Sequence, residues 1–245
     1  MKPFRIDVHA HIGNWPYASS RHDIDTLLKS ISRADIELCC VSSAKAITCD
    51  MRTGNRELFE TIESQERLAG QVVINPHFVS DSVAEIREYA NHPKFAGLKL
   101  HPSYSGEACD SSGHREIIGA YCDVSRKPVL IHTFDIGQAR AVIRLAKDFA
   151  PLPFIMAHTG GPDWKETVNE AAEFGNLYFE PASSLPFFDK VGYAVKRAGV
   201  ERFLFGTDQT LFDPWFSIGM IESAEIDEGV KKRIYRDNAL ALLNH

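Results

Sequence analysis

The sequence contains no run of apolar residues that approaches the roughly 20 residues of a membrane-spanning helix. The N-terminus, Met1 to Asp7, is short and runs directly into the first strand pattern, so we expect no signal peptide. These two absences predict a cytoplasmic protein that does not associate with a membrane.

A basic excess is also absent. The chain carries 27 Lys and Arg residues against 33 Asp and Glu residues, which gives a net charge of −6. Proteins that bind nucleic acids usually present a clustered basic face, so we expect no nucleic-acid partner. Disorder is excluded as well, because 44% of the residues are hydrophobic and 24% are charged, as in an average folded domain.

Cysteines are few, and their spacing in the sequence matches no disulfide or metal-binding pattern. The five cysteines form no Cys-x-x-Cys pair, and Cys39-Cys40 lies within an apolar run typical of a core. An odd number without recognisable spacing favours a reducing compartment over a disulfide framework.

What the sequence does contain is a regular alternation of short apolar runs with longer amphipathic stretches. We expect strands at residues 4–9, 36–42, 71–75, 95–100, 128–132, 154–158, 177–180 and 202–206. We expect helices at residues 25–34, 55–68, 82–90, 117–124, 139–149, 164–174, 187–198 and 230–243.

This alternation predicts the α/β class with a parallel sheet. Eight strands close a (β/α)8 barrel of the TIM type, and 245 residues is an ordinary length for one such domain. The rival is an open doubly wound sheet, which usually has about five or six strands. Because no linker, repeat or low-complexity segment divides the chain, we expect residues 1–245 to form a single domain.

Ionisable side chains gather where the predicted strands end. His9 and His11 end the first strand, and His132 and His158 end the fifth and sixth. His101 and Asp208 come just after the fourth and eighth. Active sites of TIM barrels lie at this carboxyl-terminal mouth. One such histidine alone is more often a hydrogen-bonded structural residue, but the joint pattern favours a catalytic metal site.

Alternation along a strand sharpens the expected site. Side chains two residues apart share a face, so Asp7, His9 and His11 should point one way and Ile6, Val8 and Ala10 the other. Lys99 and His101 should likewise share a face. Imidazole and carboxylate groups are zinc ligands, and a catalytic site keeps one position open. We therefore expect a divalent metal, zinc first and manganese as an alternative, with one ion favoured over two.

Six short motifs occur in a fixed order along the chain. They are residues 6–13 (IDVHAHIG), 97–102 (GLKLHP), 129–133 (VLIHT), 157–161 (AHTGG), 205–208 (FGTD) and 235–239 (YRDNA). Together they resemble the amidohydrolase superfamily, and in particular its amidohydrolase-related branch, which includes the aminocarboxymuconate-semialdehyde decarboxylases. The resemblance covers nearly the whole chain, and the ordered set is more specific than any one motif.

The resemblance implies roles for these residues. His9, His11, His132 and Asp208 would be metal ligands, and His158 either a second-metal ligand or an acid/base group. Asp208 would also take a proton from metal-bound water, whose pKa a divalent ion lowers towards about 7. Lys99 would orient a substrate carboxylate. Two alternatives stay open: a carboxylated, metal-bridging lysine, and a structural pair with Asp7 or another acid inside the barrel mouth.

Weaker indications concern the substrate and the surroundings of the metal. Lys99, His101, Trp15 and Arg52 are candidate substrate contacts, and cationic groups there suit a small anionic substrate. Glu180, at the end of the seventh predicted strand, is placed to hydrogen-bond a ligand histidine.

Three functions are compatible with these features. The main hypothesis is a metal-dependent hydrolase that uses metal-bound water against an amide, ester or lactone of a small carboxylated molecule. The alternatives are a metal-dependent non-oxidative decarboxylase and a metal-stabilised binding protein without turnover. No pattern identifies an oligomeric interface, and a homo-oligomer stays open.

Overall fold

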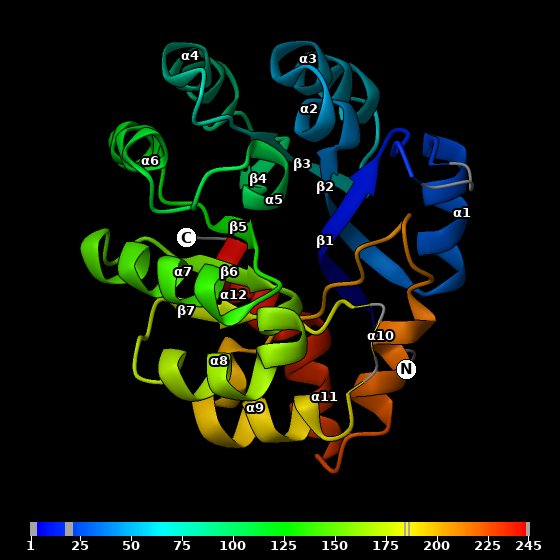
Figure 1. The fold of residues 1–245 in the computed structure, drawn as a ribbon. Helices are drawn as coiled ribbons and strands as arrows, with labels where there is room; N and C mark the ends of the chain where they lie inside the picture. The colour runs from blue at the N-terminus through cyan, green and yellow to red at the C-terminus, as the bar shows by residue number, and fades with distance from the viewer. Residues whose placement is uncertain (1–3, 18–21, 184, 186, 244–245) are drawn as a thin grey trace.

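In the computed structural model, which describes residues 4–17, 22–183, 185 and 187–243, parallel strands curl around a common axis with helices outside them (Figure 1). The sheet has seven strands, and each pairs with its neighbour in sequence, in the order β1 to β7. Their bounds are β1 Arg5–Ile12, β2 Ile36–Ser43, β3 Leu68–Val73, β4 Phe95–Leu100, β5 Val129–His132, β6 Phe154–Ala157 and β7 Leu177–Phe179.

Helices fill the connections between strands, as the amphipathic stretches predict. They are α1 Ile24–Arg33, α2 Ala44–Thr48, α3 Met51–Ile62, α4 Val79–Tyr89, α5 Pro102–Ser105, α6 Ser112–Val124, α7 Ile136–Asp148, η1 His158–Asp163, α8 Trp164–Ala171 and α9 Lys190–Ala198. The carboxyl-terminal part adds η2 Val200–Arg202, α10 Trp215–Glu222, α11 Glu228–Lys232, η3 Arg233–Asp237 and α12 Asn238–Leu243. No helix of the described residues is long and apolar enough to span a membrane.

The prediction of an eighth strand at residues 202–206 is wrong, although these residues lie where that strand was expected, between the seventh strand and the first. Arg202 ends the short helix η2, and the chain from Phe203 to Gln209 makes only two isolated bridges, Phe179 with Phe203 and Ala10 with Gln209. This segment, residues 203–209, nevertheless lies between β7 and β1; because it connects the two edges of the sheet, it is the closing segment of the barrel. The prediction of an α/β barrel of the TIM type is thus confirmed, with an irregular eighth side.

Apolar side chains cover both faces of the sheet, as in parallel sheets flanked by helices. The larger cluster joins the strands to the surrounding helices. A smaller cluster contains Ile6, Val8, Leu130, Ile155 and Leu204, and α12 contributes Ala239 and Leu242 to it. The polar mouth of the barrel therefore rests on an apolar base.

The expected alternation fails within β1. Its pairing with β2 is irregular between Asp7 and Ala10, and Ala10 packs in the larger cluster while Ile6 and Val8 pack in the smaller one. An extra residue in a strand shifts the following side chains to the other face. The Asp7 side chain therefore does not join the rings of His9 and His11; its carboxylate accepts from the His9 backbone N–H and from Thr207 and Gln209.

Candidate metal and catalytic site

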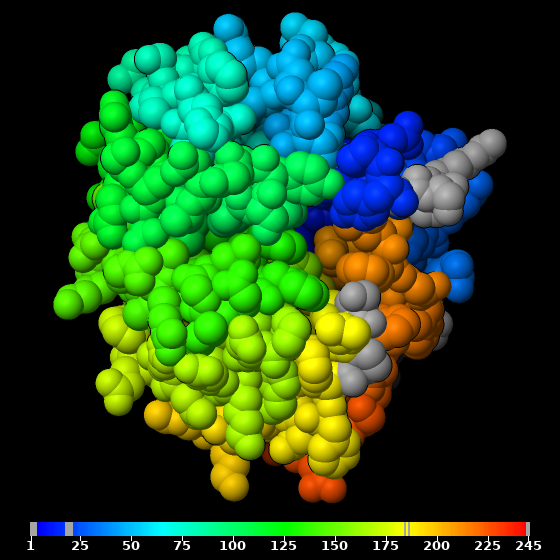
Figure 2. Space-filling model, viewed as in Figure 1, coloured from blue at the N-terminus to red at the C-terminus, as the bar shows by residue number. Residues whose placement is uncertain are grey.

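Side chains from six sides of the barrel meet at the carboxyl-terminal mouth. His9 and His11 lie in β1, Lys99 lies in β4, and His132 ends β5. His101, His158 and Glu180 directly follow strands, and Asp208 lies in the segment that joins β7 to β1. This face is closely filled, with a small recess where dark blue atoms of β1 lie below green, blue and orange segments (Figure 2). The convergence follows from the parallel arrangement, which brings all the strand ends to one mouth.

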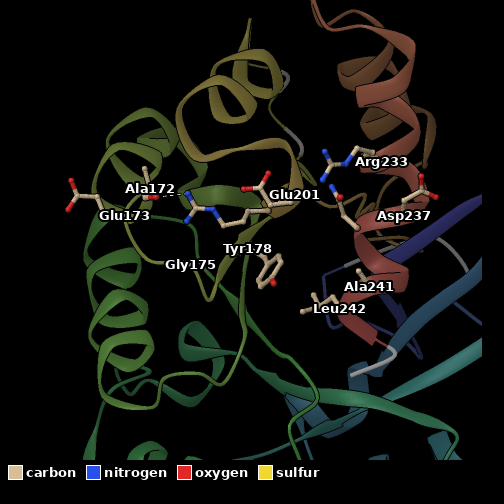
Figure 3. A pocket seen from close by; sticks show the side chains of 11 residues that line it. Ala172, Glu173, Gly175, Tyr178, Glu201, Arg233, Asp237, Ala241 and Leu242 are labelled. Atoms are coloured by element: carbon tan, nitrogen blue, oxygen red, sulfur yellow. Dashed lines mark hydrogen bonds between the residues drawn. The ribbon is translucent and has the colours of Figure 1, made fainter.

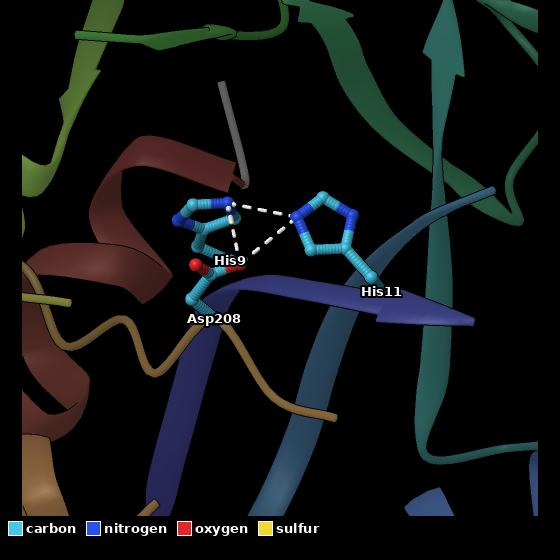
Figure 4. A group of neighbouring side chains, drawn as sticks. All are labelled: His9, His11 and Asp208. Carbon is cyan, nitrogen blue, oxygen red and sulfur yellow. Dashed lines mark hydrogen bonds and ion pairs between the residues drawn. The ribbon is translucent and has the colours of Figure 1, made fainter. Parts of the chain in front are cut away.

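One group of potential ligand atoms among the described residues consists of His9, His11 and Asp208 (Figure 4). The two Nε2 atoms lie 3.2 Å apart, and Asp208 Oδ1 lies 3.0 Å from His11 Nε2 and 3.5 Å from His9 Nε2. Ligand atoms about 2.1 Å from a tetrahedral ion lie about 3.4 Å apart. Asp208 Oδ1 is buried without a hydrogen-bond partner. These residues therefore fit a divalent ion.

Outer hydrogen bonds fix the tautomers of His9 and His158. His9 Nδ1 donates to Glu180 Oε1 at 3.0 Å, and His158 Nδ1 donates to the carbonyl oxygen of Ala182 at 2.6 Å. In these two rings the proton is on Nδ1 and the lone pair is on Nε2, as in metal-ligating histidines. His11 Nδ1 lies 2.9 Å from the hydroxyl of Ser42, which can donate or accept. The predicted hydrogen bond from Glu180 to a site histidine is confirmed.

His132 lies beside this group without joining it. Its Nδ1 atom is 3.1 Å from His158 Nε2, and its ring stacks on His101 with centroids 4.1 Å apart. Neither group of potential ligands among the described residues contains His132; they are His9 with His11 and Asp208, and His9 with His158 and Glu180. Its role as a ligand stays a prediction.

Lys99 reaches the middle of the cluster, as alternation along β4 predicts. The side chain is fully buried, and Nζ lies 2.8 Å from His9 Nε2. Burial lowers the pKa of Lys99 to about 8, against the opposing effect of the carboxylates of Asp208 and Glu180. The alternative pair with Asp7 is not formed: Asp7 accepts hydrogen bonds from Thr207 and Gln209.

The site histidines are neutral bases in this environment. Burial lowers the pKa of His132 to about 3, and it lowers the pKa of His9, His101 and His158 well below the ordinary value. The positive charge of Lys99 adds to the effect of burial at each of them. A neutral imidazole is the form that can bind a metal or accept a proton.

Two residues of the site have left-handed backbones, which residues other than glycine seldom adopt. Asp208 has φ 57° and His158 has φ 63°. Asp208 stands between Thr207 and Gln209, whose side chains both donate to the fully buried Asp7 carboxylate. His158 is held by Glu180, which accepts from its backbone N–H at 2.7 Å, and by Lys190, which donates to its carbonyl oxygen at 2.7 Å.

Lys190 and the role of Asp7 were missed by the sequence analysis. Lys190 follows Phe187-Phe188-Asp189 at the start of a predicted helix, where a lysine is normally solvated, and nothing in its neighbourhood indicates burial. Asp7 was assigned to the wrong face, because the irregularity of β1 has no signal in the residues themselves.

The substrate candidates divide into two kinds. Trp15 is buried and packs edge-on against His11 with ring centroids 4.9 Å apart, and it lies beside Tyr104 and His101. Arg52 instead lies on α3, with its side chain 65% exposed, and forms ion pairs with Asp81 and Glu85. The structure thus places Trp15 and His101 at the cluster and gives Arg52 no contact with it.

A surface pocket of about 520 Å³ lies elsewhere, between the region of β7 and the carboxyl-terminal helices (Figure 3). Its lining mixes acidic and basic side chains, including Glu201, Arg233 and Asp237, and includes no residue of the histidine cluster. The potential metal ligands therefore lie in the histidine cluster at the mouth and not in this pocket.

A family profile described as amidohydrolase matches residues 6–244. The chain belongs to this amidohydrolase family. The membership confirms the resemblance that the six motifs predict, and it places the chain among the enzymes of the amidohydrolase superfamily. A comparison with curated protein sequences gives no significant match.

Solved structures with the same fold include several decarboxylases. The 5-carboxyvanillate decarboxylase of Sphingomonas paucimobilis is 15% identical, with TM-score 0.76 and 99% coverage of both chains. A dihydroxybenzoic acid decarboxylase from Polaromonas, solved with manganese and 2-nitroresorcinol, is 16% identical, with TM-score 0.79 and coverage of 98% of this chain and 97% of the other. A 5-carboxyvanillate decarboxylase from Novosphingobium aromaticivorans, solved with manganese and a nitrobenzoic acid, is 11% identical, with TM-score 0.81 and coverage of 100% and 98%.

Proposed function

We propose that this chain is a metal-dependent non-oxidative decarboxylase of small aromatic carboxylic acids. The observation that carries the proposal is the buried cluster of histidines, Asp208 and Lys99 at the mouth of a barrel. Decarboxylases share this barrel over nearly its whole length. The decarboxylase alternative of the sequence analysis is thus preferred over the hydrolase that was its main hypothesis.

Four residues would hold the ion: His9, His11, His132 and Asp208. Three imidazoles with one carboxylate suit zinc, while carboxylate and imidazole together also accept manganese. Manganese is the ion bound in two of the similar decarboxylases. When bound, the metal supplies positive charge that attracts substrate oxygen atoms and withdraws electrons from them.

The substrate would lie between charge and aromatic rings. The Lys99 ammonium is fully buried and suits an anionic oxygen of the substrate. Trp15, Tyr104 and His101 form an aromatic group at the same mouth, with the Trp15 and Tyr104 centroids 5.7 Å apart. Aromatic side chains favour stacked or edge-on contacts with a planar ring. Together they favour a flat, aromatic acid.

Decarboxylation breaks the bond between the ring carbon and the carboxylate carbon, releases CO₂ and requires one proton on the ring carbon. His158 and Asp208 are the residues available for this proton. The Nδ1–H of His158 is bound to Ala182, so its neutral Nε2 would first take a proton from water and then pass that proton to the ring carbon as the bond to CO₂ breaks. General acid/base groups act best when another contact fixes their orientation, as it does here.

The test is a product assay on manganese-loaded and zinc-loaded protein. Incubation with 5-carboxyvanillate, 2,6-dihydroxybenzoate and related aromatic acids in D₂O should release CO₂ and place one deuterium on the ring carbon. Parallel incubation with esters, amides and lactones in ¹⁸O-water detects hydrolysis. Hydrolysis of that second panel, with no CO₂ from any acid, would replace the decarboxylase by the hydrolase. Metal stabilisation without either product would indicate a binding protein.

A further inference from the structure

Lys190 is a buried lysine that no step of the proposed reaction uses. It begins α9, its side chain is 1% exposed, and Nζ donates to the carbonyl oxygen of His158 at 2.7 Å. Burying an ammonium group is costly unless an opposite charge and hydrogen bonds compensate. The compensating charge is Glu180, which is also fully buried, while the ring of Phe187 lies 5.9 Å from Nζ.

Glu180 and Lys190 hold the backbone of His158 from both sides. Glu180 Oε1 accepts from the His158 backbone N–H at 2.7 Å, and Lys190 binds the carbonyl oxygen of the same residue. The left-handed backbone at His158 continues into Thr159, with φ 52°. Such conformations are unfavourable for residues other than glycine and persist only where surrounding contacts impose them.

The same carboxylate connects this backbone to the metal cluster. Glu180 Oε1 accepts from His9 Nδ1 at 3.0 Å, and Oε2 accepts from the Ala182 backbone N–H at 2.7 Å. The carbonyl oxygen of Ala182 in turn receives the His158 ring. The backbone hydrogen bonds of His158 and the hydrogen bond of its Nδ1 atom therefore lead to Glu180 or Lys190, directly or through Ala182.

We propose that Lys190 is a positioning residue that holds His158 in its left-handed conformation and so directs the His158 ring to the centre of the site. Lys190 touches neither substrate nor metal in this role and acts through the His158 carbonyl oxygen and through Glu180. The inference rests on the proposed function in one respect, since the expected loss of kcat assumes that His158 transfers the proton.

The experiment compares Lys190→Met with Lys196→Met, an exposed lysine on the same helix. Zinc-loaded protein with ¹⁵N-labelled histidine gives ring signals for each histidine, and His158→Gln identifies those of His158. Lys190→Met should shift the His158 ring signals and reduce kcat about 10-fold or more, with KM changed less than about threefold and zinc content kept. Lys196→Met should leave both unchanged.

A second variant protects the test against loss of folding. Glu180→Gln combined with Lys190→Met removes both buried charges, which proteins tolerate better than one unpaired charge. Compared with Glu180→Gln alone, the double variant also lacks the donor to the His158 carbonyl oxygen, so its His158 signals should be displaced further. Wild-type His158 signals in the methionine variants would overturn the inference, as would unchanged kcat in an active enzyme. Displaced signals with no turnover even in the wild-type protein would instead count against the proposed function alone.

Discussion

The Nδ1 atom of His9 lies 3.0 Å from Oε1 of Glu180, a residue 171 positions further along the chain. The contact joins the first strand to the end of the seventh. It fixes the tautomer of His9, so that the Nε2 lone pair is available next to His11 and Asp208.

Replacing Glu180 by glutamine should therefore weaken metal binding. An amide cannot accept from His9, His158 and Ala182 together, and loss of such an outer partner typically costs about 10–100-fold in metal affinity. Titration of the metal-free protein with zinc or manganese measures the effect. Glu166→Gln, which removes a surface partner of Arg140, is the matched control and should bind metal normally. Equal affinity in both variants would remove Glu180 from the metal site.

His132→Ala should abolish metal-dependent activity if His132 is the fourth ligand. The loss of metal affinity should exceed the about 10–100-fold expected of an outer partner, because a ligand atom itself is removed. His101→Ala is the comparison, since His101 stacks on His132 but is not placed among the ligands. Near-wild-type activity of His132→Ala with a full metal load would show that His132 is no ligand.

Metal binding should stabilise the fold. A metal that binds only the folded chain adds about 2.7 kcal/mol to the free energy of unfolding at 100 times its dissociation constant. Denaturant titrations with and without zinc or manganese should show this gain in the wild-type protein. Asp208→Asn and His11→Ala should lose most of it, and a full gain in both variants would place the metal elsewhere.

The metal-free protein should lose stability as the pH falls below about 6.5. In the folded chain, burial keeps the pKa of His9, His101, His132 and His158 below that value, so the unfolded chain binds more protons there. Each such histidine contributes a slope of about 1.4 kcal/mol per pH unit. Denaturant titrations between pH 5 and 7 should give a shallower slope for His101→Phe, and an identical slope would contradict the prediction.

Trp15→Ala should weaken the binding of aromatic acids. The indole is buried against His11 and near Tyr104, and an aromatic pair contributes about 0.5–1.5 kcal/mol beyond its buried area, so an increase in KM or Kd of about 2–12-fold is expected. Phe78, whose ring is 57% exposed, gives the matched control Phe78→Ala. Binding of 2,6-dihydroxybenzoate to metal-loaded protein, measured by calorimetry, checks the difference; equal losses in both variants would exclude a specific role for Trp15.

The residues themselves determined the class of fold and the position of the site. Apolar runs separated by amphipathic helices predict a parallel barrel, because the period of the pattern follows from backbone geometry. Strand ends then place His9, His11, Lys99, His158 and Asp208 at one mouth, since all parallel strands end there.

Only the tertiary structure decided how those residues are held. The irregularity of β1 turned Asp7 away from the histidines, and the closing segment made two bridges in place of a strand. Lys190 became buried because α9, which packs against α8 and α10, brings its ammonium group to the His158 carbonyl oxygen, and no local pattern records this contact. Periodicity shows which side chains share a face, whereas hydrogen bonds between residues far apart in sequence depend on distances that only the folded chain sets.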